Sequence, residues 1–256
     1  MLIEIEILRF DSSRGTFKAL RDLVAIEDIV SLYVNDNLYT TFHCTPFKIE
    51  DLALGRLITD GLIEGVREVL EVRVSGRDVY VSLLGVKAAN IMEKPRLIAA
   101  ILRGAPPERI LRLSQRIKSN DLKFSADAIF KAANVLNTLA KVFRASGGTH
   151  AAALISDNCE AVAFAEDIGR HNAVDKVVGE AAAKGVDFCR LILASTGRLT
   201  SEIVLKAAWI GVPVIVSLSA PTSMGVRLAE ALGLTLVGFV REGRFNIYTS
   251  SDKVVG

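Results

Sequence analysis

The second half of the chain alternates short aliphatic runs with helical patterns, and this alternation constrains the fold more than any other feature. Each predicted helix ends at a glycine, and the later strands are unbroken aliphatic runs, as parallel strands covered on both faces require. The pattern predicts a three-layer α/β domain. Its predicted elements are a hairpin of Ala151–Ile155 and Ala161–Ala165, a helix from about His171 to Ala183, strand Arg190–Ala194, helix Ser201–Ile210, strand Val214–Leu218, helix Thr222–Leu232, and strands Thr235–Val240 and Arg244–Tyr248.

The first half reads as a smaller α+β segment. Two hairpins are predicted, one within residues 31–42 and one within residues 69–84, with a helix over 45–61 between them. Residues 86–125 suggest short helical pieces, and Arg112–Lys123 is basic and polar, which suits a solvated connecting loop. A helix capped by Ser125 is expected to continue to about Arg144. We therefore expect an N-terminal domain over 1–120 and a domain carrying the ligand pocket over 121–256.

Composition narrows the class of protein. The chain has 256 residues, 50% of them apolar, and a net charge of +2, which is too small to indicate a nucleic-acid surface. Three widely separated cysteines, Cys44, Cys159 and Cys189, imply neither a disulfide framework nor a metal site. The N-terminus does not resemble a signal peptide, and no apolar run approaches the ~20 residues of a membrane span. We expect a cytoplasmic protein without membrane or nucleic-acid partners.

Polar loops follow the predicted strands, and the densest polar stretch is Glu166–Lys176. In α/β sheets, ligands bind beyond the carboxyl ends of the strands, near helix N-termini. Gly197 and Arg198 suit a phosphate, because one leaves the backbone uncovered and the other supplies a guanidinium fork. The candidate binding residues are Gly148, Thr149, His150, Gly169, Arg170, His171, Asn172, Asp175, Lys176, Ser195, Gly197, Arg198, Ser219, Pro221, Thr222 and Ser223.

Simpler interpretations stay open for these loops. Ser-Gly and Ala-Pro-Thr-Ser sequences are ordinary turn and helix-cap chemistry. Arg170 with Asp167, or Asp175 with Lys176, can be surface ion pairs that contribute little stability. For His171 we favour a functional role, because it lies at the start of a helix among polar neighbours and not on an apolar face.

The order of elements is that of a zinc deaminase, so that enzyme class is tested first. Its zinc site needs a Glu two residues after the His and a Cys pair at the start of the next helix. Here Ala173 follows His171-Asn172, and Arg198-Leu199-Thr200-Ser201 holds no cysteine. No metal site is therefore predicted.

Several segments together resemble the FdhD family of formate dehydrogenase accessory sulfurtransferases. The resemblance rests on motifs along nearly the whole chain, the most specific being Gly169-Arg170-His171-Asn172-Ala173-Val174-Asp175-Lys176. Others are Ser146–Leu154, Ser195–Arg198, Gly211–Val214, Ser219–Ser223, Arg244–Thr249, Tyr33–Asn35 and Thr45–Gly55.

The resemblance implies a cytoplasmic homodimer with a deaminase-like second domain that lacks zinc. It further implies binding of the bis-molybdopterin guanine dinucleotide form of the molybdenum cofactor. Sulfur would come from a cysteine desulfurase and pass to the cofactor of a formate dehydrogenase-type molybdoenzyme. The cofactor contacts that the family places near the last strand match Phe245, Asn246, Ile247, Tyr248, Thr249 and Ser250.

The family's sulfur-carrying Cys-x-x-Cys is missing. Alignment on Ser125-Ala126-Asp127 puts Lys118 and Asp121 at the two cysteine positions, and neither side chain can carry a persulfide. Two hypotheses follow, so an enzymatic activity stays undecided. In one, sulfur transfer uses another thiol, with Cys44 the one near a family motif. In the other, the protein is a cofactor-binding chaperone or scaffold that carries no sulfur.

Overall fold

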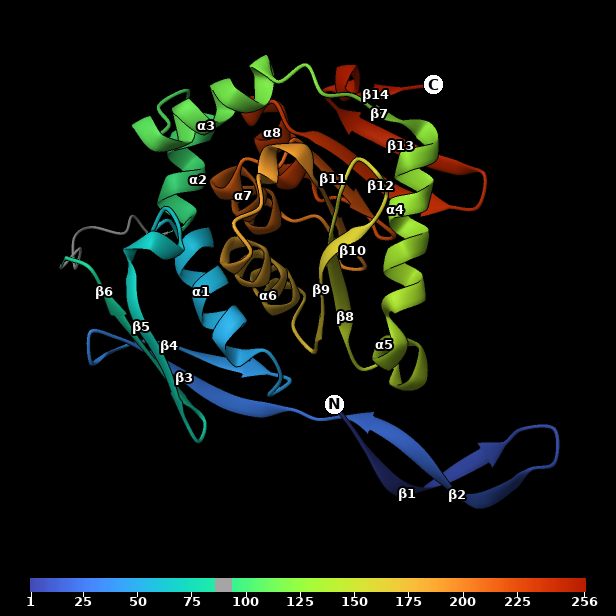
Figure 1. The fold of residues 1–256 in the computed structure, drawn as a ribbon. Coiled ribbons are helices and arrows are strands. Elements are labelled where there is room, and N and C mark those ends of the chain that lie inside the picture. The colour runs from blue at the N-terminus through green and yellow to red at the C-terminus, as the bar shows by residue number, and fades with distance from the viewer. Residues whose placement is uncertain (86–93) are drawn as a thin grey trace.

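A six-stranded mixed sheet forms the centre of the second half of the chain (Figure 1). The structure, a computed structural model, describes residues 1–85 and 94–256. The strand order is β13-β12-β11-β10-β8-β9, in which β10, β11 and β12 are parallel and the other neighbours antiparallel. The strands are β8 (His150–Ile155), β9 (Ala161–Asp167), β10 (Ile192–Ser195), β11 (Val214–Ser217), β12 (Thr235–Arg241) and β13 (Arg244–Thr249). Every predicted strand in this half is confirmed to within two residues.

Helices cover both faces of this sheet. On one side lie α6 (Arg170–Ala183), α7 (Ser201–Ile210) and α8 (Ser223–Leu232), and on the other lies α4 (Ala126–Leu139) (Figure 1). Successive strand residues point to opposite faces. Ala152 and Leu154 therefore join the core on the α6 side, while Ala151 and Ala153 join the core under α4. This double burial explains why the strands are aliphatic throughout.

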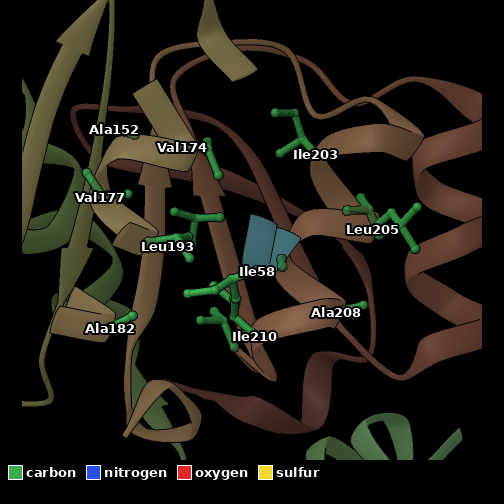
Figure 2. Close-up of a cluster of buried hydrophobic side chains, with 14 of the residues drawn as sticks. Ile58, Ala152, Val174, Val177, Ala182, Leu193, Ile203, Leu205, Ala208 and Ile210 are labelled. Atoms are coloured by element: carbon green, nitrogen blue, oxygen red, sulfur yellow. The ribbon is translucent and has the colours of Figure 1, made fainter. Parts of the chain in front are cut away.

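The core on the α6 side joins the two halves of the sequence. Figure 2 shows Ile58 of the first half beside Leu193 of β10 and Ile210 of α7. The same cluster of buried side chains runs from Val30 to Leu236. Residues from both predicted segments, 1–120 and 121–256, thus share one hydrophobic core.

The first half consists of a four-stranded sheet and a helix that packs against α6. The sheet has the order β4-β3-β6-β5, and β3 pairs with β6 in parallel, where only antiparallel strands were expected. Its elements are β3 (Asp28–Val34), β4 (Asn37–Cys44), α1 (Ile49–Thr59), the 3-10 turn η1 (Val66–Glu68), β5 (Val69–Ser75) and β6 (Asp78–Leu83). Both predicted hairpins are confirmed. The predicted helix starts late, at Ile49, because Lys48 before it has a left-handed backbone, at φ 54°, which an α-helix does not contain.

Helices α1 and α6 touch backbone to backbone through two glycines. A Cβ on Gly55 would overlap the carbonyl oxygen of Asp175, and one on Gly179 would overlap that of Asp51. Only glycine permits so close an approach. This contact brings the end of β4, through His43, and the C-terminal end of α1, through Thr59, against the polar motif on α6.

The prediction of a connecting loop over Arg112–Lys123 is wrong for most of its length. Helix α3 (Glu108–Ser119) continues through Arg112 to Ser119, preceded by α2 (Lys94–Leu102). Ile110, Ser114 and Ile117 are buried at helical spacing, while the basic side chains occupy the outer face. The high charge of that outer face hid the amphipathic pattern. The beginning of the expected helical segment, residues 86–93, lies outside the described residues.

Two further differences concern the helix after Ser125 and the N-terminus. The Ser125 hydroxyl accepts from Ala128 N, which confirms the cap, but the helix breaks at Ala140 into α4 and α5 (Lys141–Ser146). An unpredicted hairpin, β1 (Leu2–Asp11) and β2 (Thr16–Ala25), extends away from the body (Figure 1). Short elements complete the chain: β7 (Phe124–Ser125), η2 (Phe188–Arg190), η3 (Ser251–Lys253) and β14 (Val254–Val255). Within the described ranges, no helix has the length and apolarity to cross a membrane.

Candidate functional site

Four polar segments meet where β9, β10 and β11 end and β8 begins. His150 Nδ1 lies 3.3 Å from the Thr196 hydroxyl, and a Cβ on Gly197 would lie 2.8 Å from Arg170 Cβ. Leu199 N donates to the carbonyl of Ala220 at 3.0 Å. Three of the predicted loops and the start of β8 are therefore neighbours, as expected for the carboxyl edge of an α/β sheet.

Cationic side chains gather at this edge. Burial, and then the charge of Arg198, lowers the pKa of Arg170. Burial also lowers the pKa of His150, followed by the charges of Arg170 and Arg198. Arg170 Nε is buried and has no hydrogen-bond partner among the described residues. A buried guanidinium nitrogen without an acceptor is costly, so this edge suits an anionic ligand.

His171 lies beside this cluster in a drier environment. Burial, then the charges of Arg170 and Lys206, lowers its pKa from 6.5 to about 4. Its Nε2 is 3.5 Å from Glu202 Oε2, too far for a good hydrogen bond. Thr200 Oγ1, at the start of α7, is likewise buried without a partner in the described part of the chain. At neutral pH, His171 is a neutral polar group rather than a cation.

A cavity of about 890 Å³ opens next to the Thr196 loop, between α4 and the ends of β11 and β12. Its polar lining includes Asn134 and Asn137 of α4 and Ser219. Phe130 contributes an aromatic surface and pairs with Phe245 at 5.1 Å between ring centroids. The cavity combines aromatic faces with amide and hydroxyl groups, as a planar polar ligand would require.

Sequence reasoning missed several residues of this cavity. Thr196, Asn134, Asn137 and Arg241 line it, and none was a candidate. The two asparagines lie three residues apart beside the apolar stripe of α4, so both face the same side of the helix. That spacing was the signal available in the sequence. No such signal in the sequence indicated Arg241, which donates to Leu218 O at 2.6 Å.

The predicted residues of the last strand serve different purposes. Phe245 meets the cavity wall through Phe130, and Tyr248 contacts Gly238. Asn246 donates to the Tyr248 hydroxyl at 3.3 Å, and Ile247 is partly exposed. Thr249 is buried and donates to Leu234 O at 2.6 Å, and Ser250 O accepts from Thr235. Phe245 is therefore the member of this group that the structure brings next to the cavity.

The Asp175 and Lys176 side chains point into the protein. Lys176 Nζ lies 2.6 Å from Asp167 Oδ2 and also donates to Thr45 O and Oγ1. Both charged side chains of this pair are at most 1% exposed. A buried pair contributes little net stability, but removing one partner leaves an uncompensated charge and costs several kcal/mol, about 3–5.

A second buried network surrounds Asp175. Lys206 Nζ is 2.5 Å from Asp175 Oδ1, and Thr59 at the end of α1 donates to the same oxygen at 2.6 Å. Arg56 approaches the other carboxylate oxygen at 3.9 Å. Asp175 and Lys176 thus tie α6 to the first half of the chain.

The remaining candidates are engaged in turns and caps. Gly169 N and Asn172 Nδ2 donate to Asp167 Oδ1, and Ser195 Oγ accepts from Gly197 N. The Thr222 hydroxyl caps α8, whose first residue is Ser223, and Pro221 pairs with Leu199. Thr149 donates to Glu166, and Gly148 lies against Ala25 of the hairpin. These roles match the simpler interpretation of the loops. Arg170 and Arg198 remain as the candidates for contact with a ligand.

Cys44 and Cys189 lie in surroundings that disfavour a reactive thiolate. Cys44 is fully buried, and burial, followed by the Asp167 charge, raises its pKa to about 12. Burial also raises the pKa of Cys189. Cys159, in the turn between β8 and β9, is the least buried of the three.

The fold and this site define an α/β protein with a cluster of cationic side chains at the carboxyl edge of its main sheet and a cavity next to it. The FdhD/NarQ family model matches residues 25–255. The chain belongs to the FdhD/NarQ family.

Relatives in distant organisms match almost end to end. The "Sulfur carrier protein FdhD" of Listeria monocytogenes is 33% identical, with 97% of both chains covered. The proteins of the same name from Sulfolobus acidocaldarius and Anaeromyxobacter dehalogenans are 36% and 38% identical, covering 91% and 92% of this chain and 91% and 90% of theirs. The crystal structure of a candidate formate dehydrogenase accessory protein from Desulfotalea psychrophila aligns with a TM-score of 0.81 at 25% identity, covering 99% of each chain.

Proposed function

We propose that this protein binds the guanine dinucleotide part of a molybdenum cofactor during maturation of a formate dehydrogenase-type enzyme. The observation that carries the proposal is the cavity of about 890 Å³ that adjoins, through Thr196 and His150, the edge where Arg170 has a buried nitrogen without an acceptor. Relatives over nearly the whole chain are named for sulfur carriage, and the similar crystal structure for a formate dehydrogenase accessory role.

The residues present fit such a group. Arg170 and Arg198 supply guanidinium forks for the diphosphate, and Gly197, which has no side chain, leaves room for the Arg170 side chain to pack on its backbone. Asn134 and Asn137 supply amides for the edge of a base, and Phe130 a face on which it stacks. When bound, the cofactor would supply the metal centre that the client enzyme uses. Asp175 and Lys176 hold α6 in place without touching the nucleotide.

The wider proposal includes a deaminase-like second domain without zinc, a cytoplasmic homodimer, and a cysteine desulfurase as sulfur donor. The exposed apolar side chains of the β1–β2 hairpin, among them Leu8, Phe10 and Phe17, support self-association, since a second copy would cover them.

Calorimetric titration with GDP tests the binding function. We expect saturable binding that Arg170→Ala and Arg198→Ala each weaken about tenfold, because each removes a charge-assisted contact of about 1.5 kcal/mol. Arg190→Ala is the matched control, since its exposed pair with Asp157 lies at the other end of the sheet. Absence of GDP binding by the unchanged protein would remove the basis of the proposal.

Sulfur transfer is the second candidate, favoured by the names of the relatives. Lys118 and Asp121 occupy the expected carrier positions, and Lys118 lies on α3 with its aliphatic stem against Gly233. The remaining thiol hypothesis names Cys44, whose raised pKa keeps it protonated at neutral pH. The geometry therefore favours a cofactor scaffold.

Mass spectrometry after incubation with a cysteine desulfurase and cysteine separates the two candidates. We expect no persulfide on Cys44. An adduct of one sulfur atom that disappears in Cys44→Ala would show sulfur transfer and reject the scaffold-only hypothesis.

A further inference from the structure

A second cleft, of about 580 Å³, lies at the far ends of the helices that begin at the candidate cofactor site. Its walls are α3, the turn Glu64–Glu68 and the segment 185–188 after α6. Since α6 has 14 residues, its two ends are ~20 Å apart. The cleft is therefore separate from the cofactor site, and nothing proposed above depends on it.

The floor of this cleft is aromatic. Trp209, the single tryptophan of the chain, lies at the end of α7 and lines the cleft with Phe188 and Ile58. Gly61, at φ +76°, lies against the Trp209 ring, where a Cβ would collide with it. An apolar side chain of a ligand can pack on this floor, where it is shielded from water.

Arg109 places a positive charge over the floor. Its guanidinium carbon lies 4.7 Å from the Trp209 ring centroid, and the group donates to the carbonyls of Gly61 and Ile63 at 3.3 and 3.1 Å. Glu64 approaches to 3.7 Å, but its side chain is 64% exposed. Glu68 is a second acidic neighbour, but burial outweighs both carboxylates and lowers the pKa of Arg109, so this charge is compensated only in part.

Two more arginines extend the positive surface along α3. Arg112 and Arg116 follow Arg109 at intervals of three and four residues, which puts all three on one side of the helix. Their partners, Glu108 at 2.9 Å and Asp187 at 3.1 Å, form exposed pairs. Exposed pairs contribute little, so a ligand carboxylate can replace these partners at small cost.

The acidic residues of the walls limit what can bind. Glu64, Glu68 and Asp187 line the same cleft, so a highly charged polyphosphate would be repelled. A ligand with two carboxylates and an apolar group fits better.

We propose that this cleft binds a short acidic segment of a partner protein in extended conformation. Arg112 and Arg116 are ~6 Å apart along the helix, close to the ~6.7 Å between side chains i and i+2 of a strand. Two carboxylates at i and i+2 therefore match the two arginines. The apolar side chain between them points away from these two arginines, into the remainder of the cleft, which Trp209 and Phe188 help to line.

Trp209 fluorescence reports binding directly, because no other tryptophan contributes. The probe is a blocked pentapeptide, Gly-Glu-Phe-Glu-Gly, and the control peptide replaces both Glu by Lys. We expect a saturable change with the acidic peptide alone, weakened by added salt. Arg112→Glu combined with Arg116→Glu should reduce the affinity about tenfold or more, since two exposed charge contacts are reversed.

A matched variant controls for net charge. Arg14→Glu with Arg21→Glu makes the same charge change on the exposed hairpin, and it should bind the peptide as the unchanged protein does. Circular dichroism checks that both double variants are folded.

Three results would overturn the proposal. The first is no fluorescence change, or an equal loss of affinity in both double variants. The second is a response to inorganic pyrophosphate that depends on Arg112 and Arg116 while the peptide gives none, which would indicate a small-anion site. The third is a change with protein concentration alone that the α3 substitutions abolish, which would show that a second copy fills the cleft.

Discussion

Within Glu166–Lys176, the side chains at the start of α6 have different surroundings from those one turn further along the helix. Arg170 and His171 lie at the edge of the candidate site, while Asp175 and Lys176 point into buried networks with Lys206 and Asp167. A helix turns by about 100° per residue, so a five-residue interval carries a side chain to a different side. One motif therefore contributes to the candidate site at its start and holds the fold together at its end.

His171 should make stability depend on pH. Its pKa is about 4 in the folded protein and 6.5 ordinarily, so between these values the unfolded chain binds a proton that the folded protein does not. Stability therefore rises with pH across that window and falls on acidification from about 6.5 toward 4. We expect His171→Asn to flatten this dependence by up to ~3 kcal/mol, measured by urea unfolding from pH 7 to 4.5.

Titration of the individual histidines by NMR is the control, because it measures the pKa of His171 directly. The chain has three histidines, so nitrogen NMR resolves each imidazole. Burial also lowers the pKa of His150, which shifts stability in the same direction and persists in the variant. An imidazole of His171 that becomes charged near pH 6.5 would contradict this account.

Among the elements, the crossing of α1 and α6 determines the position of the site. Gly55 and Gly179 let the two backbones touch, and Thr59 at the end of α1 then reaches the Asp175 carboxylate at 2.6 Å. Before the start of α1, Thr45 reaches Asp167 at 3.1 Å. The polar motif is thus bonded to α1 and to the segment just before it, more than 100 residues earlier in the chain.

Adding one methyl group at the crossing should separate the helices. Gly55→Ala and Gly179→Ala each place a Cβ on a backbone carbonyl, which cannot rotate away. We expect each to lower the free energy of unfolding by about 3 kcal/mol or more, measured by chemical denaturation. Gly65→Ala is the control, because its Cβ meets open space at an extended φ of 178°. Equal stabilities of the three variants would show that the crossing relaxes freely.

For the whole molecule, the buried core that stabilises the fold lies outside the N-terminal β1–β2 hairpin, in the remainder of the chain. The described core residues begin at Val30, and Ile3, Leu8 and Phe17 on the hairpin are 50%, 71% and 69% exposed. An isolated two-stranded hairpin is marginally stable in water.

Deleting residues 3–23 should therefore leave the body folded. We expect the free energy of unfolding of the monomer to change by less than ~1 kcal/mol, because the deletion removes no fully buried side chain. Urea unfolding at low protein concentration measures this. A loss of several kcal/mol would show that the hairpin belongs to the cooperative unit through its contact with Gly148.

The sequence by itself determined the elements of the second half, because glycine stops and aliphatic strands are local signals. It also located the polar loops and the family motifs. It did not reveal α3, whose charged outer face hid the buried Ile110 and Ile117. Nor did it show the β1–β2 hairpin, although Leu2–Asp11 pairs with Thr16–Ala25 along its whole length.

Only the tertiary structure decided which polar residues lie at the candidate site and which are buried in networks. Lys176 and Arg170 are both cations on α6, yet one is sealed by Thr45 and Asp167 and the other has a buried nitrogen without a partner in the described chain. The cavity likewise forms only because Asn137 of α4 and Thr196, which follows β10, come together in its lining. Burial and partner choice arise from contacts between distant segments, and a local pattern carries no information about them.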